Sequence, residues 1–194
     1  QLDRAAIFAG VDRKPEDPAN LFRIAIAFEQ RAVDFFSREG ERAPEGSVER
    51  ELYRELARYL ATILGVDGAF IAVIDPAQPG RLRMLAFHFD GETRENFSYP
   101  QVGTPCETVI GHGYRFYSHQ LREMFPTDLD FGKLGVESYA GHPLSDSAGR
   151  TLGLIAVISR HRLEHPTFVE SVLRIFAVRV NSELERLAAA ESAR

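Results

Sequence analysis

The sequence predicts a mixed α/β fold, α+β in its layers. We expect an antiparallel sheet of five or six strands with long N- and C-terminal helices on one face and short helices and loops on the other. Three observations lead to this prediction. Apolar residues recur with a helical period near the N-terminus and again after Pro166. Between these regions, short segments rich in β-branched and aromatic residues alternate with turn residues. Strands joined by such short turns pair antiparallel.

The N-terminal region, residues 1–46, is predicted to hold a tail and one amphipathic helix. Residues 1–16 show no clear period and are expected to form a tail or a short helix. Asp17 can cap a helix that begins at Pro18 and ends before Gly40. Apolar residues of this helix follow i, i+3, i+4 spacing: Leu21, Ile24, Ala25, Phe28, Ala32, Phe35 and Phe36.

A second helix and a first hairpin follow. Ser47 is expected to cap a helix that ends at Gly65. Residues 69–74 and 82–89 are predicted as strands, because both segments are apolar and rich in β-branched or aromatic residues. The turn residues 75–80 join them into a hairpin. One face of the helix is apolar, with Val48, Leu52, Leu56, Tyr59, Leu60 and Ile63.

Residues 90–134 are predicted to form an irregular connection over one face of the sheet. Residues 95–99 favour a third, short strand, and a Thr-Pro pair opens a short helix within residues 103–113. Residues 114–117 are predicted as an edge strand. Two weak helical turns are expected in residues 121–134.

The closing hairpin organises the rest of the chain. Residues 138–144 and 151–159 are predicted strands, joined by a turn over residues 145–149. The second strand is apolar at nearly every position, which is typical of a central strand covered on both faces. Pro166 begins the last helix, whose apolar positions keep the helical period for about six turns. These positions are Phe168, Val169, Val172, Leu173, Phe176, Ala177, Val180, Leu184 and Leu187.

The hairpin run GVESYAGHPLSDSAGRTLGLIAV, which begins at Gly135, resembles the closing hairpin of a GAF domain. The resemblance extends back through Thr104-Pro105-Cys106 to the helix near Ser47, and forward to Arg186. It implies a GAF-like domain core over residues 47–165. It also implies that residues 166–194 form a signalling and dimerisation helix.

The resemblance also implies a function. GAF domains are sensory modules of signalling proteins, so we expect a non-catalytic, cytoplasmic regulatory domain of a protein such as a sensor histidine kinase. The expected partner is a second copy, bound through the N- and C-terminal helices. A small molecule would favour one arrangement of the connection and the hairpin, and so move the flanking helices. The first and last residues, Gln1 and Arg194, suggest a fragment of a longer protein.

A ligand of a GAF domain lies between the sheet and the connection that covers it. Aromatic and polar residues predicted to face this space are therefore candidates for a binding pocket. The alternative is that the aromatic residues fill an ordinary core without a cavity. The candidate residues are Phe87, His88, Phe97, Cys106, Tyr117, Phe125, Phe131, Tyr139 and His142.

Cys106 admits two interpretations. At a helix N-terminus, free N–H groups favour a thiolate, which would suit redox sensing or covalent attachment of a chromophore. Alternatively it is a small buried apolar residue. Photoreceptor GAF domains pair the attachment cysteine with a histidine and carry an Asp-Ile-Pro stretch, whereas Glu107 follows here and no such stretch is present. The Asn-Lys-x-Phe-Asp-Glu pattern of cyclic-nucleotide GAF domains is also absent. The resemblance thus disfavours bilin and cyclic GMP, and the cofactor stays unknown.

Two other functions stay open. One is a redox sensor or small reductase centred on Cys106, as in GAF-like methionine sulfoxide reductases. Those enzymes use several cysteines, and this chain has one. The other is a dimerising spacer that binds no ligand, which the sequence does not distinguish from a sensor.

Composition and motifs exclude several classes. A formal net charge of -5 and the absence of a basic stripe argue against nucleic-acid binding. No apolar run approaches the ~20 residues of a membrane helix. A single cysteine excludes an internal disulfide and fits a reducing cytoplasm. The histidines are too scattered for a metal motif, since Pro166 separates His161 and His165 from the helix body. No nucleophile elbow, phosphate loop or dinucleotide fingerprint is present.

Overall fold

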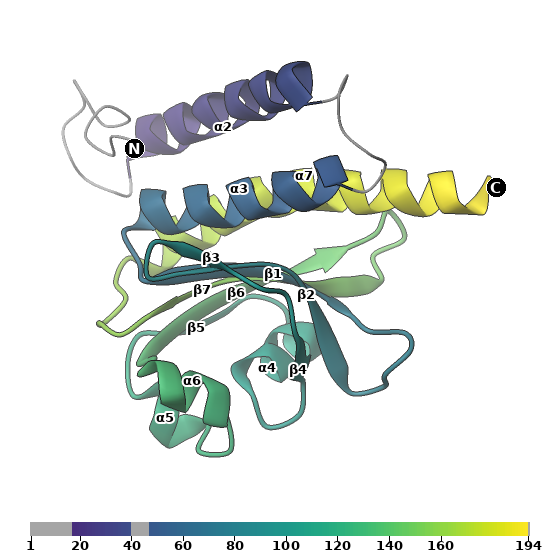
Figure 1. The fold of residues 1–194 in the computed structure, drawn as a ribbon. Coiled ribbons are helices and arrows are strands. Elements are labelled where there is room, and N and C mark those ends of the chain that lie inside the picture. Colours follow the sequence, from purple (N-terminus) through teal and green to yellow (C-terminus); the bar gives the residue numbers. More distant parts are fainter. Residues whose placement is uncertain (1–16, 40–46, 194) are drawn as a thin grey trace.

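The computed structural model describes residues 17–39 and 47–193, which form a layered α+β domain (Figure 1). The prediction for residues 1–16 lies outside the described residues, as do residues 40–46. In order, the helices are α2 (Pro18–Glu39), α3 (Ser47–Leu64), α4 (Pro105–His112), α5 (Leu121–Met124), α6 (Leu129–Leu134) and α7 (Pro166–Ser192). The strands are β1 (Gly68–Ile74), β2 (Arg81–Phe89), β3 (Glu92–Arg94), β4 (Ser98–Pro100), β5 (Arg115–Tyr117), β6 (Ser138–Ser145) and β7 (Thr151–Ser159).

The described strands form one antiparallel sheet of seven strands in the order β3-β2-β1-β7-β6-β5, with β4 also paired to β2. The predicted number, five or six, was too low. The single strand expected at residues 95–99 is instead two short strands, which pair with opposite ends of β2. A bulge interrupts the pairing of β1 with β2 between Ile71 and Ala72. Near it, the Asn96 side chain donates to the carbonyl of Leu85 at 2.9 Å, between the two edge strands.

The prediction that the second strand of the closing hairpin is central is confirmed. β7 lies between β1 and β6 and is covered on both faces. Leu154, Ala156 and Ile158 face the side of α4–α6, while Ile155 and Val157 face the long helices. Such a strand reads as a continuous apolar run because neither face meets water.

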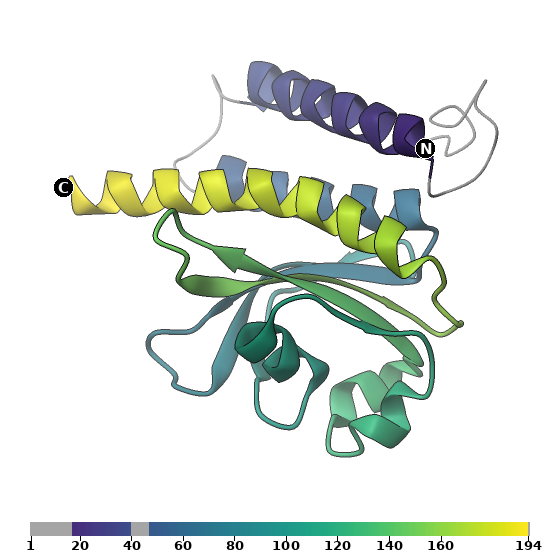
Figure 2. The ribbon, with the colours of Figure 1, turned by 180° about the vertical axis from the view of Figure 1, so that it is seen from behind.

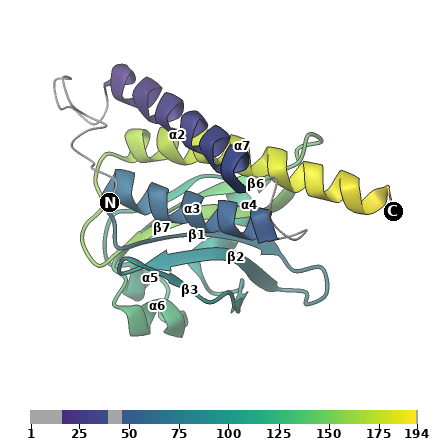
Figure 3. The same ribbon diagram turned by 45° about the horizontal axis from the view of Figure 1, so that its top comes forward.

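The long helices cover the other face of the sheet in two layers. α3 and α7 pack on the strands, and α7 lies along β6 (Figure 2). α2 crosses α3 and α7 as an outer layer (Figures 1 and 3). Phe28 of α2 meets Phe176 of α7 at 4.3 Å between ring centroids, and Tyr59 of α3 meets Phe176 at 5.9 Å. One aromatic cluster therefore holds the three helices together.

Candidate functional site

Seven of the nine predicted pocket residues gather between the sheet and α4–α6. Phe87, Cys106, Phe131 and Tyr139 are buried there, and Tyr117 and Phe125 pack against them. Phe97 lies at the edge, 37% exposed, with its ring 5.7 Å from that of Phe87. The connection therefore covers this face of the sheet as predicted.

His88 and His142 lie on the opposite face, so the expectation that they line the same pocket was wrong. Side chains of a strand alternate between faces. Ala86, two residues before His88, belongs to the core beneath the long helices, as do Ala140 and Leu144 on either side of His142. Burial lowers the pKa of both histidines, with a further lowering by Arg58 for His88.

Aromatic rings fill the space in which a ligand was expected. Phe131 stacks on Tyr99 at 5.4 Å and lies 6.3 Å from Tyr139 between centroids. Phe70 of β1 lies 6.1 Å from Phe131 and 6.5 Å from Tyr139. These spacings are those of packed aromatic pairs. In this state the interior between the sheet and the connection is a packed core.

A buried polar network runs through this aromatic core. The Tyr99 hydroxyl donates to Oδ2 of Asp128. Oδ1 of Asp128 accepts from the backbone N–H of Phe131 at 3.0 Å and thereby caps α6. Close by, the Tyr139 hydroxyl donates to Sγ of Cys106 at 3.6 Å. These bonds link β4, at one edge of the sheet, and strand β6 to the helices that cover them.

Burial disfavours charge on the titratable groups of this network. It raises the pKa of the Cys106 thiol to about 12, because a thiolate would lie away from water. This is the reverse of the lowering that a helix N-terminus favours, and it fits the interpretation of Cys106 as a small buried apolar residue. Burial also raises the pKa of Asp128, although the bonds from Tyr99 and Phe131 oppose the shift. The environment of the Cys106 thiol therefore suits packing rather than nucleophilic chemistry.

Sequence reasoning missed Tyr99 and gave Asp128 no role. Tyr99 was placed in a strand, but its alternation was too short to show which face it occupies. Asp128 follows Pro126 and Thr127 and precedes a helix, which is the position of an N-cap residue. This pattern in the sequence therefore indicates the cap that the structure shows.

A shallow depression lies over this network, between α5 and α6. Its volume of about 150 Å³ is open to solvent. No part of it is enclosed deeply enough to hold a buried water molecule. Its lining includes Asp128, Phe125 and Phe131. Arg122 stands at the rim, paired with Glu137. Any access to the aromatic core from this side requires α5 or α6 to move.

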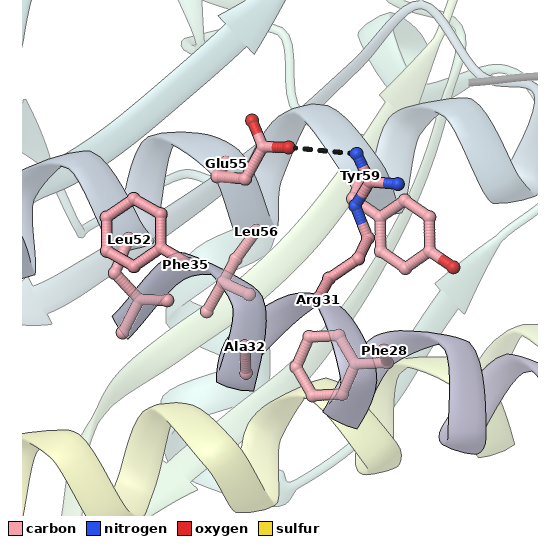
Figure 4. A pocket seen from close by; sticks show the side chains of 8 residues that line it. All are labelled: Phe28, Arg31, Ala32, Phe35, Leu52, Glu55, Leu56 and Tyr59. Carbon is pink, nitrogen blue, oxygen red and sulfur yellow. Dashed lines mark hydrogen bonds and ion pairs between the residues drawn. The ribbon is translucent and has the colours of Figure 1, made fainter. Parts of the chain in front are cut away.

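A second recess, of about 230 Å³, lies between α2 and α3 (Figure 4). An ion pair closes it: Nη2 of Arg31 lies 3.2 Å from Oε1 of Glu55, and the guanidinium lies 4.9 Å from the centre of the Tyr59 ring. Burial raises the pKa of Glu55, but hydrogen bonds from Arg58 and Arg31 outweigh this and lower it overall. Apolar side chains form the rest of the recess: Phe28, Ala32, Phe35, Leu52 and Leu56. It is an imperfect fit between two helices.

The turn of the closing hairpin is bonded to α7. The backbone N–H of Ser145 donates to Oδ1 of Asn181 at 3.1 Å, and that of Ser147 donates to Glu185. The turn itself is stiff, because Oδ1 of Asp146 accepts from the N–H of Arg150 at 2.8 Å and of Ala148 at 3.0 Å. We call this contact between residues 145–149 and α7 the hairpin joint.

The described residues contain no cluster of three or more histidine, cysteine or acidic side chains placed to hold a metal ion. His161 and His165 lie in the segment between β7 and α7, outside any helix. Within the same described ranges, no helix combines the length and apolar character needed to cross a bilayer.

A family model for the GAF domain matches residues 49–184, more than half of the chain. Similar solved structures include the chromophore-binding domain of Stigmatella aurantiaca phytochrome P1, with 16% identity, a TM-score of 0.55, and coverage of 80% of this chain and 59% of that one. The GAF domain of A. aeolicus nlh2 in an inactive state has 14% identity, a TM-score of 0.59, and coverage of 85% and 98%.

A third similar structure is a domain of a protein assigned as a two-component sensor histidine kinase from Sinorhizobium meliloti 1021. It has 16% identity, a TM-score of 0.54, and coverage of 77% of this chain and 99% of that one. The chain thus spans less than two thirds of the phytochrome domain and nearly all of the other two. At these identities the similarity establishes the fold alone. No curated protein matches the chain.

Proposed function

The chain belongs to the GAF domain family, and from this premise we propose that it is a non-catalytic sensory or regulatory domain of a cytoplasmic signalling protein. The similar structures support this proposal, since they include a phytochrome domain and a domain assigned to a sensor histidine kinase. A sensor histidine kinase is therefore the proposed setting. The proposed unit is a homodimer that forms through the helices outside the sheet, α2 and α7.

The hairpin joint is the observation that carries this proposal. It connects the centre of the sheet to α7 through two backbone donors and two α7 side chains, those of Asn181 and Glu185. At the next residue of α7, Nη2 of Arg186 lies 2.7 Å from Oε1 of Glu49, which ties the same part of α7 to α3. A shift of the hairpin therefore pulls on α7 directly. Such a connection is what a domain needs to pass a change in its sheet to a helix.

We further propose that the ligand, a small molecule, binds beneath α4–α6, where the candidate residues gather. Because the aromatic core is packed, binding there must displace α5 or α6, and the Tyr99–Asp128 bond opposes that movement. The phytochrome domain in the comparison binds a chromophore. In this chain the burial of Cys106 and the presence of Glu107 beside it do not favour covalent attachment of a chromophore.

A ligand-free dimerising spacer is the second candidate. The packed aromatic core favours it, since the depression over Asp128 encloses no space. The redox alternative is less favoured, because the Cys106 thiol is fully buried and its pKa is about 12.

Native mass spectrometry of the freshly purified chain, before and after denaturation, tests the proposal. A dimer that carries a small excess mass, lost on denaturation, supports the sensor and gives the mass of the ligand. A bare dimer that takes up no compound from a cell extract supports the spacer. A bare monomer at micromolar concentration contradicts both, because each requires two copies.

A further inference from the structure

Phe131 lies at the centre of the aromatic core beneath α4–α6. Its ring centroid lies 5.4 Å from that of Tyr99, 6.1 Å from that of Phe70 and 6.3 Å from that of Tyr139. Those three rings belong to strands of the sheet, whereas Phe131 belongs to α6, a helix of six residues on the outside of the domain (Figure 1). Phe131 also lines the depression between α5 and α6. Of these four rings, it is therefore the one that can leave the core without disturbing the sheet.

Two contacts hold α6 over this core, one at each end. At its start, Asp128 caps the helix and accepts a hydrogen bond from the buried Tyr99 hydroxyl. At its end, Nε of Arg160 donates to the carbonyl of Leu134 at 3.0 Å, and the same guanidinium donates to both carboxylate oxygens of Asp90 at 2.6 and 2.7 Å. An arginine beside the last carbonyls of a helix stabilises that end. The Arg160 side chain is 39% exposed, so this contact is the weaker of the two.

We propose that α6 is a lid whose Phe131 side chain occupies the position of the ligand, and that the ligand is an uncharged, single-ring aromatic compound. This inference rests on the proposed sensor function and names the chemical class that its site takes. When α6 swings outward, Phe131 vacates a space of the size of its own side chain, faced by the rings of Phe70, Tyr99 and Tyr139. A planar ring makes the same offset and edge contacts there.

The polar groups around this position select against a charged ligand. The Tyr139 hydroxyl donates to the thiol of Cys106 at 3.6 Å, a weak bond that an oxygen atom of a ligand can replace. Both oxygens of Asp128 already accept hydrogen bonds from the chain. No lysine or arginine is buried in the parts of the chain that the structure describes, and Arg122 at the rim is paired with Glu137. A buried anion would therefore lie near Asp128 without a counter-charge, and a buried cation would compete for oxygens that are already bonded.

Three compounds of similar size and different charge test the ligand class: benzyl alcohol, benzoate and benzylamine, which are neutral, anionic and cationic at pH 7. Each is titrated into the isotopically labelled full chain and followed by nuclear magnetic resonance. We expect benzyl alcohol to bind with a dissociation constant on the order of 1 mM, because it has few atoms with which to offset the opening of α6. Benzoate and benzylamine should bind at least about tenfold more weakly. Hydrogen exchange in residues 129–134 should become faster when benzyl alcohol binds.

A variant of the exposed lid contact separates an opening of α6 from binding elsewhere. Arg160→Gln removes the contact at the end of α6 and leaves Phe131 and Asp128 in place. It should raise the fraction of open lid, and so lower the apparent dissociation constant of benzyl alcohol by about two- to fivefold. A general loss of stability does not tighten binding. Arg174→Gln is the matched control, because it breaks an exposed pair with Glu170 within α7, on the other face of the sheet, and should leave the constant unchanged.

The outcomes separate this inference from the sensor function itself. Tighter binding of benzoate or benzylamine than of benzyl alcohol would overturn the ligand class. An affinity for benzyl alcohol that Arg160→Gln leaves unchanged or weakens would overturn the lid. If all three compounds fail to bind while native mass spectrometry finds an excess mass that belongs to a charged or non-aromatic compound, this inference is wrong and the sensor stands. If all three fail and the dimer is bare, both are wrong.

Discussion

The bond between Tyr99 and Asp128 should account for a measurable share of the stability of the domain. Tyr99 is fully buried and Asp128 is 8% exposed, so solvent screens the bond little. A hydrogen bond to a charged partner contributes about 1.5–3 kcal/mol. We therefore expect Tyr99→Phe to lower the free energy of unfolding by about 2 kcal/mol. Asp128→Ala should cost about 3 kcal/mol, since it also removes the cap of α6, which contributes about 1 kcal/mol.

A double-mutant cycle separates this bond from general damage to the core. Both single variants lose the same bond. The double variant should therefore lower the free energy of unfolding by about 3 kcal/mol, and not by the sum of the two single losses, about 5 kcal/mol. The difference is a coupling energy near 2 kcal/mol. Urea unfolding followed by far-ultraviolet circular dichroism measures all four proteins. Tyr114→Phe is the control, because its hydroxyl bonds the Pro166 carbonyl at an exposed site and should cost under about 1 kcal/mol. If the loss of the double variant equals the sum of the two single losses within about 0.5 kcal/mol, the bond does not contribute to stability as proposed.

Three more predictions follow from the same structure. Burial raises the pKa of Asp128 above 3.8, so its ionised form is disfavoured in the folded state. The unfolding free energy of the wild type should therefore fall relative to that of Asp128→Asn as the pH rises from 3.8 through the raised pKa. A difference in unfolding free energy that stays constant between pH 3.5 and 7 would contradict this. The Cys106 thiol, fully buried with a pKa of about 12, should react with a disulfide reagent at pH 7 only after unfolding in urea, and stoichiometric labelling of the native protein would show that the interior opens. Gly153→Ala should lower the free energy of unfolding by about 3 kcal/mol or prevent folding, because the new Cβ would lie 2.1 Å from the carbonyl oxygen of Ala72. Gly111→Ala should instead raise the free energy of unfolding by about 0.5–1 kcal/mol, because Gly111 lies in a helix and no atom lies within 4 Å of the new Cβ. Thermal unfolding measures both.

The long elements of this fold were predictable from local patterns. The helices that begin at Pro18, Ser47 and Pro166 each carry a start signal and a sustained apolar period. Asp17 caps the first of them as expected, since its Oδ1 accepts from the N–H of Ala19 at 2.9 Å. The central position of β7 followed from its unbroken apolar run. In these cases the local signal and the tertiary environment agree.

The edge of the sheet was less predictable, because it depends on pairing at a distance. Residues 92–100 have too few alternating positions to reveal that they divide into β3 and β4. The bulge between Ile71 and Ala72 is set by the pairing of β1 with β2 and has no local signature. Similarly, His88 falls on the helix side of the sheet, which only the register of β2 decides.

The gathering of aromatic residues between the sheet and the connection was predictable, whereas their packing against one another was not. Aromatic residues expected around a cavity instead contact each other, as Phe131 does with Tyr99 and Tyr139. Residue type does not separate a lined cavity from a filled core, since both favour the same side chains. The contact between Tyr99 and Asp128 joins residues from a strand edge and a helix start, which no spacing in the sequence relates.

The pairing of β1 with β7 also affects how the chain is made. These two strands form the centre of the sheet, yet β1 leaves the ribosome long before β7. At ~5–20 residues per second, several seconds pass before Ile71 can meet Ile155. During that time α3 and the β1–β2 hairpin hold an apolar surface that only β7 and α7 can complete. Nascent chains that have not yet reached Ser159 are therefore the stage at which this domain most needs a chaperone.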